Sequence, residues 1–258
     1  GHSGTLDPLA SGVLGIAIGE ATKSIDYLNN KKEYEFNITF GESKTTEDLE
    51  GETLDSTRSI PNKKEIIAIL KNFLGVIEQD PPKHSAIKMN GIRSYNLARK
   101  GFNFEIKKRK VVIHDLVHIK QLNEHTHKFK TICSSGTYIR SMGRDIAIKL
   151  NSLGYISFLR RTRISKISEK NIISLDNLIE LVHIGNHFEM VQPIESVLDD
   201  IPAVYLNKVD TKKFRNGQML NIFESSSKIN KLLVLDKEVV GIGKVEEGTL
   251  VPIRMFNI

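Results

Sequence analysis

The sequence predicts an α+β protein, in which a larger part with both strands and helices precedes a small β-rich C-terminal domain. Residues 34–40 (YEFNITF) alternate strictly between apolar and polar side chains, which is the period of a half-buried strand. Residues 63–74 carry apolar side chains at helical spacing. After Asp199-Asp200 the chain changes to short apolar runs separated by turns, which is typical of a compact β domain.

The segment after the first strand is expected to be irregular until the first helix begins. Residues 42–62 are polar and contain Gly, Ser and Thr, so we expect a loop whose acidic residues are solvated. Asn62 is expected to cap the helix at 63–74, and Gly75 to end it. The residues predicted for its inner face are Ile66, Ile67, Leu70, Phe73 and Leu74. The acidic residues of the loop are Glu47, Asp48 and Glu50.

The remaining elements complete the two parts. Strands are predicted at 110–120 and 127–134, and helices at 138–150 and 172–182. The apolar stripe of the helix at 138–150 consists of Ile139, Met142 and Ile146. The predicted strands of the C-terminal domain, residues 200–258, are Ala203–Leu206, Lys231–Leu235, Val239–Val245 and Thr249–Phe256.

Composition and the absence of certain motifs limit the partners and cofactors that this protein is expected to bind. The net charge of +6 and the isoelectric point of about 9.2 favour a polyanionic partner without identifying one. A single cysteine, Cys133, excludes an internal disulfide and a cysteine-based zinc site. The histidines lack metal-binding spacing, and neither a P-loop nor a Rossmann glycine motif occurs, so no metal or other cofactor is expected. Without a signal peptide or an apolar run of ~20 residues, the chain is expected to be cytoplasmic, with no membrane contact.

The N-terminal block GHSGTLDPLASGVLGIAIGEATK, residues 1–23, holds one carboxylate, Asp7, among small residues. Pro8 fixes its own φ and keeps Asp7 out of the helical region, so the carboxylate is expected on a stiff, extended or turning backbone. Asp-Pro is also an ordinary turn signal, so this dipeptide alone does not indicate catalysis.

The complete block closely resembles the catalytic motif of the TruB family of tRNA pseudouridine synthases, GH(T/S)G(T/A)LDPLA(T/S)GxLxxxxGEATK. The resemblance implies a pseudouridine synthase fold, with a mixed, mainly antiparallel sheet and flanking helices over residues 1–199, and a PUA-like RNA-binding domain over 200–258. The family's first motif, a strand and helix before this block, is absent, and the chain begins at Gly1 within the motif.

The same resemblance assigns roles in the site. It gives Asp7 the central catalytic role, and the motif GTYIR at 136–140 places Arg140 against Asp7 and Tyr138 at the substrate pocket. Tyr34 is implied to stack on the target uracil and to be a candidate acid or base. The remaining implied substrate contacts are His2, which fills the space of the flipped base, and Leu159 of the LRR segment. From pattern alone, Tyr34 also fits a core aromatic, Arg140 a surface arginine and His2 a structural histidine.

Two basic segments are candidates for RNA contact. Residues 83–110 contain nine Lys or Arg against one acid, Glu105, with aromatic residues interleaved, and they resemble the family's RNA-clamping insertion, predicted at about 78–108. Basic groups at 160–166 fit phosphate contacts or a solvated face. The predicted RNA-contacting residues are Lys83, Lys88, Arg93, Arg99, Lys100, Arg160 and Arg161.

The resemblance implies an isomerase that converts uridine to pseudouridine at tRNA position 55, in the T-loop. The base is flipped out, its glycosidic bond breaks in an Asp7-dependent step, and the uracil rejoins through carbon 5. The expected partner is the tRNA T-arm, bound by a monomer. Asp7 attack on the base, attack on the sugar and abstraction of a sugar proton all remain open. The alternatives are a non-catalytic tRNA-binding or tRNA-folding module, and a hydrolase, which requires a second positioned carboxylate that the sequence does not indicate.

Overall fold

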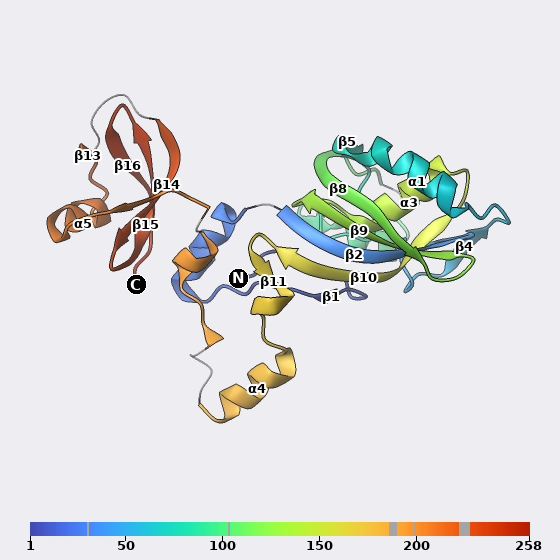
Figure 1. Ribbon diagram of the computed structural model, residues 1–258, viewed down its shortest axis with the longest axis horizontal. Coiled ribbons are helices and arrows are strands. Elements are labelled where there is room, and N and C mark those ends of the chain that lie inside the picture. The colour runs from blue at the N-terminus through green and yellow to red at the C-terminus, as the bar shows by residue number, and fades with distance from the viewer. Residues whose placement is uncertain (30, 103, 186–189, 199, 222–227) are drawn as a thin grey trace. The chain divides into compact units, whose positions relative to one another are not determined.

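A computed structural model describes residues 1–29, 31–102, 104–185, 190–198, 200–221 and 228–258 (Figure 1). The chain forms two compact units. The sheet unit consists of Leu6–Val13 and Asn30–Ile164, and the terminal unit consists of Gly1–Thr5, Leu14–Asn29 and Ser165–Ile258. These compact units are defined by contacts and do not divide at residues 199 and 200. The domain boundary expected there stays a prediction.

The sheet unit is built on a mixed sheet with the strand order β1-β10-β2-β9-β8-β5 (Figure 1). Neighbouring strands are antiparallel except for β1 and β10, which are parallel. The predicted mixed, mainly antiparallel sheet is therefore confirmed. The strand bounds are β1 Ser11–Gly12, β2 Lys31–Phe40, β5 Gly75–Gln79, β8 Arg109–Gln121, β9 Thr126–Ser134 and β10 Gly154–Ile164.

Helices α1 (Lys63–Leu70) and α3 (Ile139–Lys149) cover one face of this sheet (Figure 1). Their buried side chains join those of the alternating strand β2 in a single apolar core. The core includes the predicted stripe of α3 and every second residue of β2, as expected for a helical period of 3.6 and a strand period of 2. The core side chains from these three elements are Tyr34, Phe36, Ile38, Phe40, Ile66, Leu70, Ile139, Met142 and Ile146.

Helix α1 begins as predicted but ends earlier. The Asn62 side chain accepts hydrogen bonds from the backbone N–H groups of Lys64 and Glu65, and the Glu65 carboxylate accepts one from the Asn62 N–H. The helix ends at Leu70, and a 3₁₀ turn, η2 (Lys71–Phe73), follows before Gly75 starts β5 with φ +84°. The predictions for Ile67 and Leu74 were wrong, because both side chains are exposed. Ile67 lies outside the narrow stripe that a two-turn helix buries, and Leu74 lies beyond the end of the helix.

The predicted loop at 42–62 was wrong in one respect that affects the site. It contains a hairpin of β3 (Glu42–Lys44) and β4 (Thr53–Ser56), and part of its tip is buried. The Leu49 N–H donates to the Ile156 carbonyl, and the Ile156 N–H donates to the Glu47 carbonyl. Because the tip is tied to β10 by backbone hydrogen bonds, Asp48 is buried and Glu47 is half-buried, whereas Glu50 is exposed as expected.

The predicted RNA-clamping insertion leaves β5 and returns as β8. Within it lie a small hairpin, β6 (Lys88–Met89) and β7 (Ile92–Arg93), and the short helix α2 (Ser94–Arg99). Two buried serines hold this arrangement: the Ser94 hydroxyl lies 2.9 Å from that of Ser85 and donates to the Ser85 carbonyl at 2.7 Å. The hairpin and α2 are thereby fixed to the chain at residue 85.

The terminal unit contains a second sheet with the order β12-β14-β15-β16-β13, together with helix α5 (Figure 1). The four predicted C-terminal strands are present, whereas α5 (Lys208–Arg215) was not anticipated. The predicted helix at 172–182 is observed as α4 (Leu175–His183), which Ser174 caps. The remaining bounds are η1 Gly19–Tyr27, β11 Ile167–Ser168, η3 Glu169–Asn171, η5 Ile194–Val197, β12 Ala203–Tyr205, β13 Leu220–Asn221, β14 Ile229–Asp236, β15 Glu238–Glu246 and β16 Thr249–Met255.

Candidate active site

Asp7 lies in a tight turn that leads into β1. Its carbonyl accepts a hydrogen bond from the Ala10 N–H at 2.8 Å. Gly12 then runs so close to β10 that a Cβ at this position, with φ +102°, would lie 2.2 Å from the Arg161 carbonyl oxygen. Only glycine fits this contact. The Val13 N–H donates to the same Arg161 carbonyl at 2.7 Å, so the segment carrying Asp7 is held firmly against the sheet.

Arg140, in the first turn of α3, holds the Asp7 carboxylate with two parallel hydrogen bonds. Its Nε and Nη2 atoms donate to the two carboxylate oxygens, each at 2.9 Å. The guanidinium also donates to the carbonyls of Thr46 and His84, both at 3.0 Å. The expected Asp7–Arg140 pair is therefore present. It is only half enclosed: the Arg140 side chain is 6% exposed and that of Asp7 is 31% exposed. A bidentate pair fixes the carboxylate's orientation while one side stays accessible.

A second carboxylate, Asp48, lies beside the same guanidinium and was missed in the sequence. One of its oxygens is 3.7 Å from Arg140 Nε, and its side chain is only 3% exposed. The other oxygen accepts hydrogen bonds from the Thr46 hydroxyl and from the Glu50 N–H. The expectation that Asp48 lies in a solvated acidic loop was wrong, because the hairpin tip is fixed to β10.

The neighbouring Glu47 pairs with Arg144, one helical turn after Arg140. Arg144 Nη1 lies 2.5 Å from Glu47 Oε1, and Arg144 Nε donates to Asp145 at 2.9 Å. Burial raises the pKa of the Glu47 carboxyl, although Arg144 opposes the shift. One available signal was the i,i+4 spacing of Arg140 and Arg144, which places both on one side of the helix. Two guanidinium groups there require more acceptors than Asp7 alone provides.

Tyr34 is buried in β2, on the face that carries the core, and lies opposite Arg161 of β10. Burial raises the pKa of its phenol to about 12, and the hydrogen-bonded Arg161 guanidinium opposes this shift. The phenol is therefore neutral at physiological pH. In this state it can offer a ring for stacking and a hydroxyl for hydrogen bonding, whereas losing its proton is unfavourable.

Tyr138 and Leu159, the two other predicted pocket residues of the sheet unit, lie close in sequence to Arg140 and Arg161. Tyr138 is half-buried and directly precedes α3. Leu159 is buried in β10, opposite Phe36, and belongs to the apolar core. His2 belongs to the terminal unit, where its Nδ1 accepts a hydrogen bond from the Gly4 N–H, and its predicted role at the base remains a prediction.

The predicted RNA-contacting cations fall into two groups. The five in the insertion are exposed: Lys83, Lys88, Arg93, Arg99 and Lys100. Arg160 is half-buried and donates to the Ser11 hydroxyl at 3.1 Å. Arg161 was misplaced among them, because it is 1% exposed and its Nε donates to the Val13 carbonyl at 2.8 Å. We therefore remove Arg161 from the surface contacts and regard it as a partner of Tyr34.

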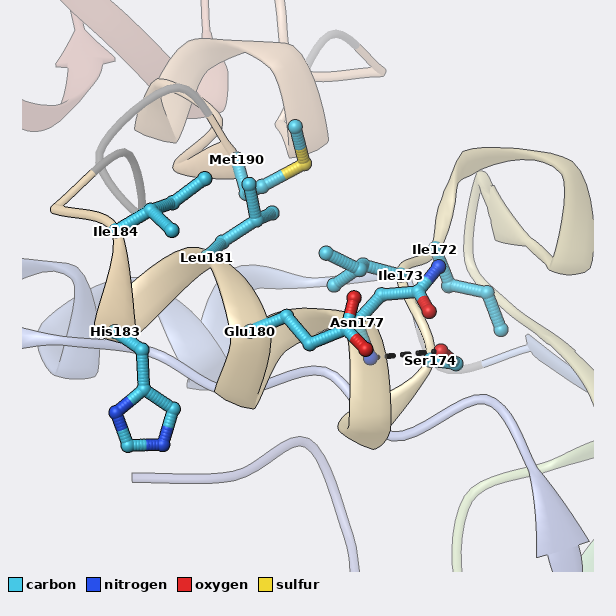
Figure 2. A pocket seen from close by; sticks show the side chains of 9 residues that line it. All are labelled: Ile172, Ile173, Ser174, Asn177, Glu180, Leu181, His183, Ile184 and Met190. Atoms are coloured by element: carbon cyan, nitrogen blue, oxygen red, sulfur yellow. Dashed lines mark hydrogen bonds between the residues drawn. The ribbon is translucent and has the colours of Figure 1, made fainter.

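Other features of the described residues do not suggest a competing site. Within those ranges, no group of three or more His, Cys, Asp and Glu side chains could hold a metal ion. None of the described helices is long and apolar enough to cross a membrane. A hollow of about 740 Å³ lies along α4 in the terminal unit and contains none of the predicted site residues (Figure 2). Its lining residues are Ile172, Ile173, Ser174, Asn177, Glu180, Leu181, His183, Ile184 and Met190.

Comparison with known proteins identifies the family. Residues 1–139 match the family model described as TruB family pseudouridylate synthase, N-terminal domain. The chain belongs to the TruB family. Residues 202–256 match the model of the TruB C-terminal domain of pseudouridine synthase II. The sequence motif at 1–23 had implied this membership, which is now confirmed, and with it the pseudouridine synthase activity class.

Curated relatives extend along the full chain. The tRNA pseudouridine synthase B of Rhodospirillum rubrum is 38% identical over 268 aligned positions, covering 100% of this chain and 87% of the relative. That of Zymomonas mobilis is 41% identical, covering 89% of this chain and 76% of the relative. Among solved structures, a Cbf5-Nop10-Gar1 complex matches with a TM-score of 0.71 at 22% identity, covering 99% of this chain and 76% of that chain. This likeness confirms the predicted pseudouridine synthase fold.

Proposed function

We propose that this TruB family protein isomerises uridine to pseudouridine at position 55 in the T-loop of tRNA. The observation that carries the proposal is the Asp7 carboxylate, oriented by two hydrogen bonds from a buried guanidinium and left accessible on one side. Phosphate binding alone does not require such a carboxylate, so this feature favours an enzyme over a non-catalytic tRNA-binding module. The names of the curated relatives agree with tRNA as the substrate.

The proposed reaction begins when the target nucleotide is flipped out of the loop. Unstacking costs a few kcal/mol, which stacking on Tyr34 and contacts with Tyr138 and Leu159 offset. His2 fills the space that the base leaves. The bond between uracil N1 and the ribose C1′ breaks in a step that depends on Asp7. The uracil rotates, C5 bonds to C1′, C5 loses its proton and N1 gains one, so the atomic composition is unchanged.

In this proposal Arg140 fixes the direction of the Asp7 carboxylate. Tyr34 acts as a neutral ring and hydroxyl donor, since its pKa of about 12 opposes deprotonation. Lys83, Lys88, Arg93, Arg99, Lys100 and Arg160 hold the phosphates of the T-arm. The PUA-like region at 200–258 adds RNA contacts. The protein acts as a monomer in the cytoplasm and requires no cofactor.

The experiment compares wild type with Asp7→Asn on a T-arm hairpin that contains a single target uridine. Pseudouridine is detected by carbodiimide treatment and primer extension, or by mass spectrometry. We expect wild type to form product and Asp7→Asn to be slower by on the order of 10³-fold or more. Asp55→Asn, at an exposed position of β4, is the matched control and should keep the wild-type rate. Tight binding by wild type without product would support the non-catalytic module instead.

A further inference from the structure

A short segment at the root of the insertion, residues 79–84, lies along the N-terminal half of α3; we call it the strap. It begins at the last residue of β5 and ends just before the Ser85–Ser94 pair. Its two consecutive prolines, Pro81 and Pro82, are both buried. Proline has a fixed φ, so the strap is stiff between its two ends.

Gln79 attaches the start of the strap to the residue before α3. Its Nε2 donates to the Tyr138 carbonyl at 3.0 Å, and its Oε1 accepts from the Tyr138 N–H at 2.8 Å. One side-chain amide thus bonds both backbone groups of Tyr138, and Gln79 is 1% exposed. The Tyr138 carbonyl also accepts a hydrogen bond from the Met142 N–H at 3.0 Å. A glutamine amide supplies a donor and an acceptor side by side, which few other side chains can do here.

The rest of the strap binds the side chains of α3. The Asp80 carbonyl accepts hydrogen bonds from the Ser141 hydroxyl at 2.7 Å and from Arg144 Nη2 at 3.0 Å. The His84 carbonyl accepts one from Arg140 Nη2, the same nitrogen that donates to Asp7. The strap therefore restrains the arginine that orients the catalytic carboxylate.

We propose that Gln79 is a positioning residue: its amide fixes the start of α3, and through the strap it sets the direction from which Arg140 holds Asp7. This inference rests on the proposed function, because it concerns the geometry of the same site. Gln79 itself contacts neither Asp7 nor Arg140. Its effect is transmitted by Tyr138, which is two residues before Arg140, and by the His84 carbonyl.

The strap also links this site to the predicted RNA-clamping insertion. Beyond His84, the Ser85–Ser94 hydrogen bonds fix α2 and the hairpin, whose exposed cations include Lys88 and Arg99. The strap is therefore the connection between RNA bound by these cations and helix α3. A loosened strap should let RNA bind normally while Asp7 is less well aligned for reaction.

The test measures RNA affinity and single-turnover rate separately for two variants and a control. Gln79→Met has a similar volume but loses both hydrogen bonds to Tyr138. Gln79→Glu keeps the acceptor for the Tyr138 N–H, and a carboxylate is favoured at a helix N-terminus, but its second oxygen replaces the donor that faces the Tyr138 carbonyl. Gln121→Met changes an exposed glutamine on β8 of the same unit and should behave as wild type. Enzyme in excess over a T-arm hairpin reports the chemical step alone.

We expect Gln79→Met to lower the single-turnover rate about 10- to 100-fold, since a misplacement of about 1 Å can cost 10²-fold. Gln79→Glu should lie between it and wild type, and the Kd for the hairpin should stay within about two-fold for both. Equal rates in all variants, or a loss confined to Kd, would overturn the inference. So would a Gln79→Met protein that does not fold, since Gln79 would then be required for folding. A wild type that binds RNA without forming product would instead overturn the proposed function.

Discussion

Two regions of the sheet unit place cationic side chains in opposite surroundings. Around the start of α3, Arg140 is almost completely buried and donates to carboxylate and backbone oxygens of three separate segments. In the insertion, Lys88 and Arg99 are exposed on a small hairpin and a short helix. In the sequence the two regions look alike, because both are basic and both lie near aromatic residues.

The difference shows how charge is used in the two regions. A buried guanidinium is stable only if nearly all its N–H groups find acceptors, so it fixes whatever supplies them. An exposed lysine has no such requirement and remains available for a mobile polyanion. We therefore expect changes near α3 to affect folding and chemistry together, and changes at the exposed cations of the insertion to affect RNA affinity alone.

The largest effect is expected for Arg140→Met. It should lower activity by about 10³-fold or more, since Asp7 loses its orientation, and lower the free energy of unfolding by about 3–5 kcal/mol, because Asp48 becomes a buried carboxylate without its cation. Product assays and urea unfolding measure the two quantities. Adding Asp48→Asn should recover much of the stability but none of the activity. An Arg140→Met protein as stable as wild type would contradict the comparison.

Much of the fold was predictable because its periods are regular. The alternation at 34–40 predicted β2 except for its first three residues, and the apolar stripe at Ile139, Met142 and Ile146 predicted α3 almost to the residue. The hairpin at 42–56 was missed since its residues are polar and its stability comes from backbone bonds to β10, which lies about a hundred residues later in the chain. Helix α5 was missed because its sequence, KVDTKKFR, has only two apolar residues, Val209 and Phe214, and they do not lie at helical spacing.

For the site, the sequence motif supplied Asp7 and Arg140, whereas the residues around them required the structure. Asp48 and Gln79 carry no local pattern, and their burial follows from contacts made across the sheet unit. Arg161 illustrates the reverse case. Strand period places Arg161 on the face of Leu159 and Arg160 on the other face, so the sequence contained enough information to predict its burial.

An intermediate effect is expected at alkaline pH from Tyr34, the phenol paired with buried Arg161. Its folded pKa of about 12 exceeds the ordinary value of 10.0, so the unfolded chain ionises first and stability falls as pH rises from 10 towards 12. Wild type should lose about 1 kcal/mol more than Tyr34→Phe between pH 9 and 11. Urea unfolding of both proteins across this range measures the difference. An identical pH dependence would show that the phenol is solvated.

The smallest effect is expected for Lys88→Gln in the exposed hairpin. It removes one candidate phosphate contact, so RNA affinity should fall only about 2- to 5-fold at moderate salt, and the slope of log K against log salt should decrease by about 1. The single-turnover rate and the melting temperature should not change.

Arg161→Gln is the informative counterpart: it should lower the melting temperature, since Val13 and Tyr34 lose their buried donor, and leave the salt slope unchanged. If Arg161→Gln reduced the salt slope as Lys88→Gln does, Arg161 would contact RNA directly, and the division between buried and exposed cations would be wrong.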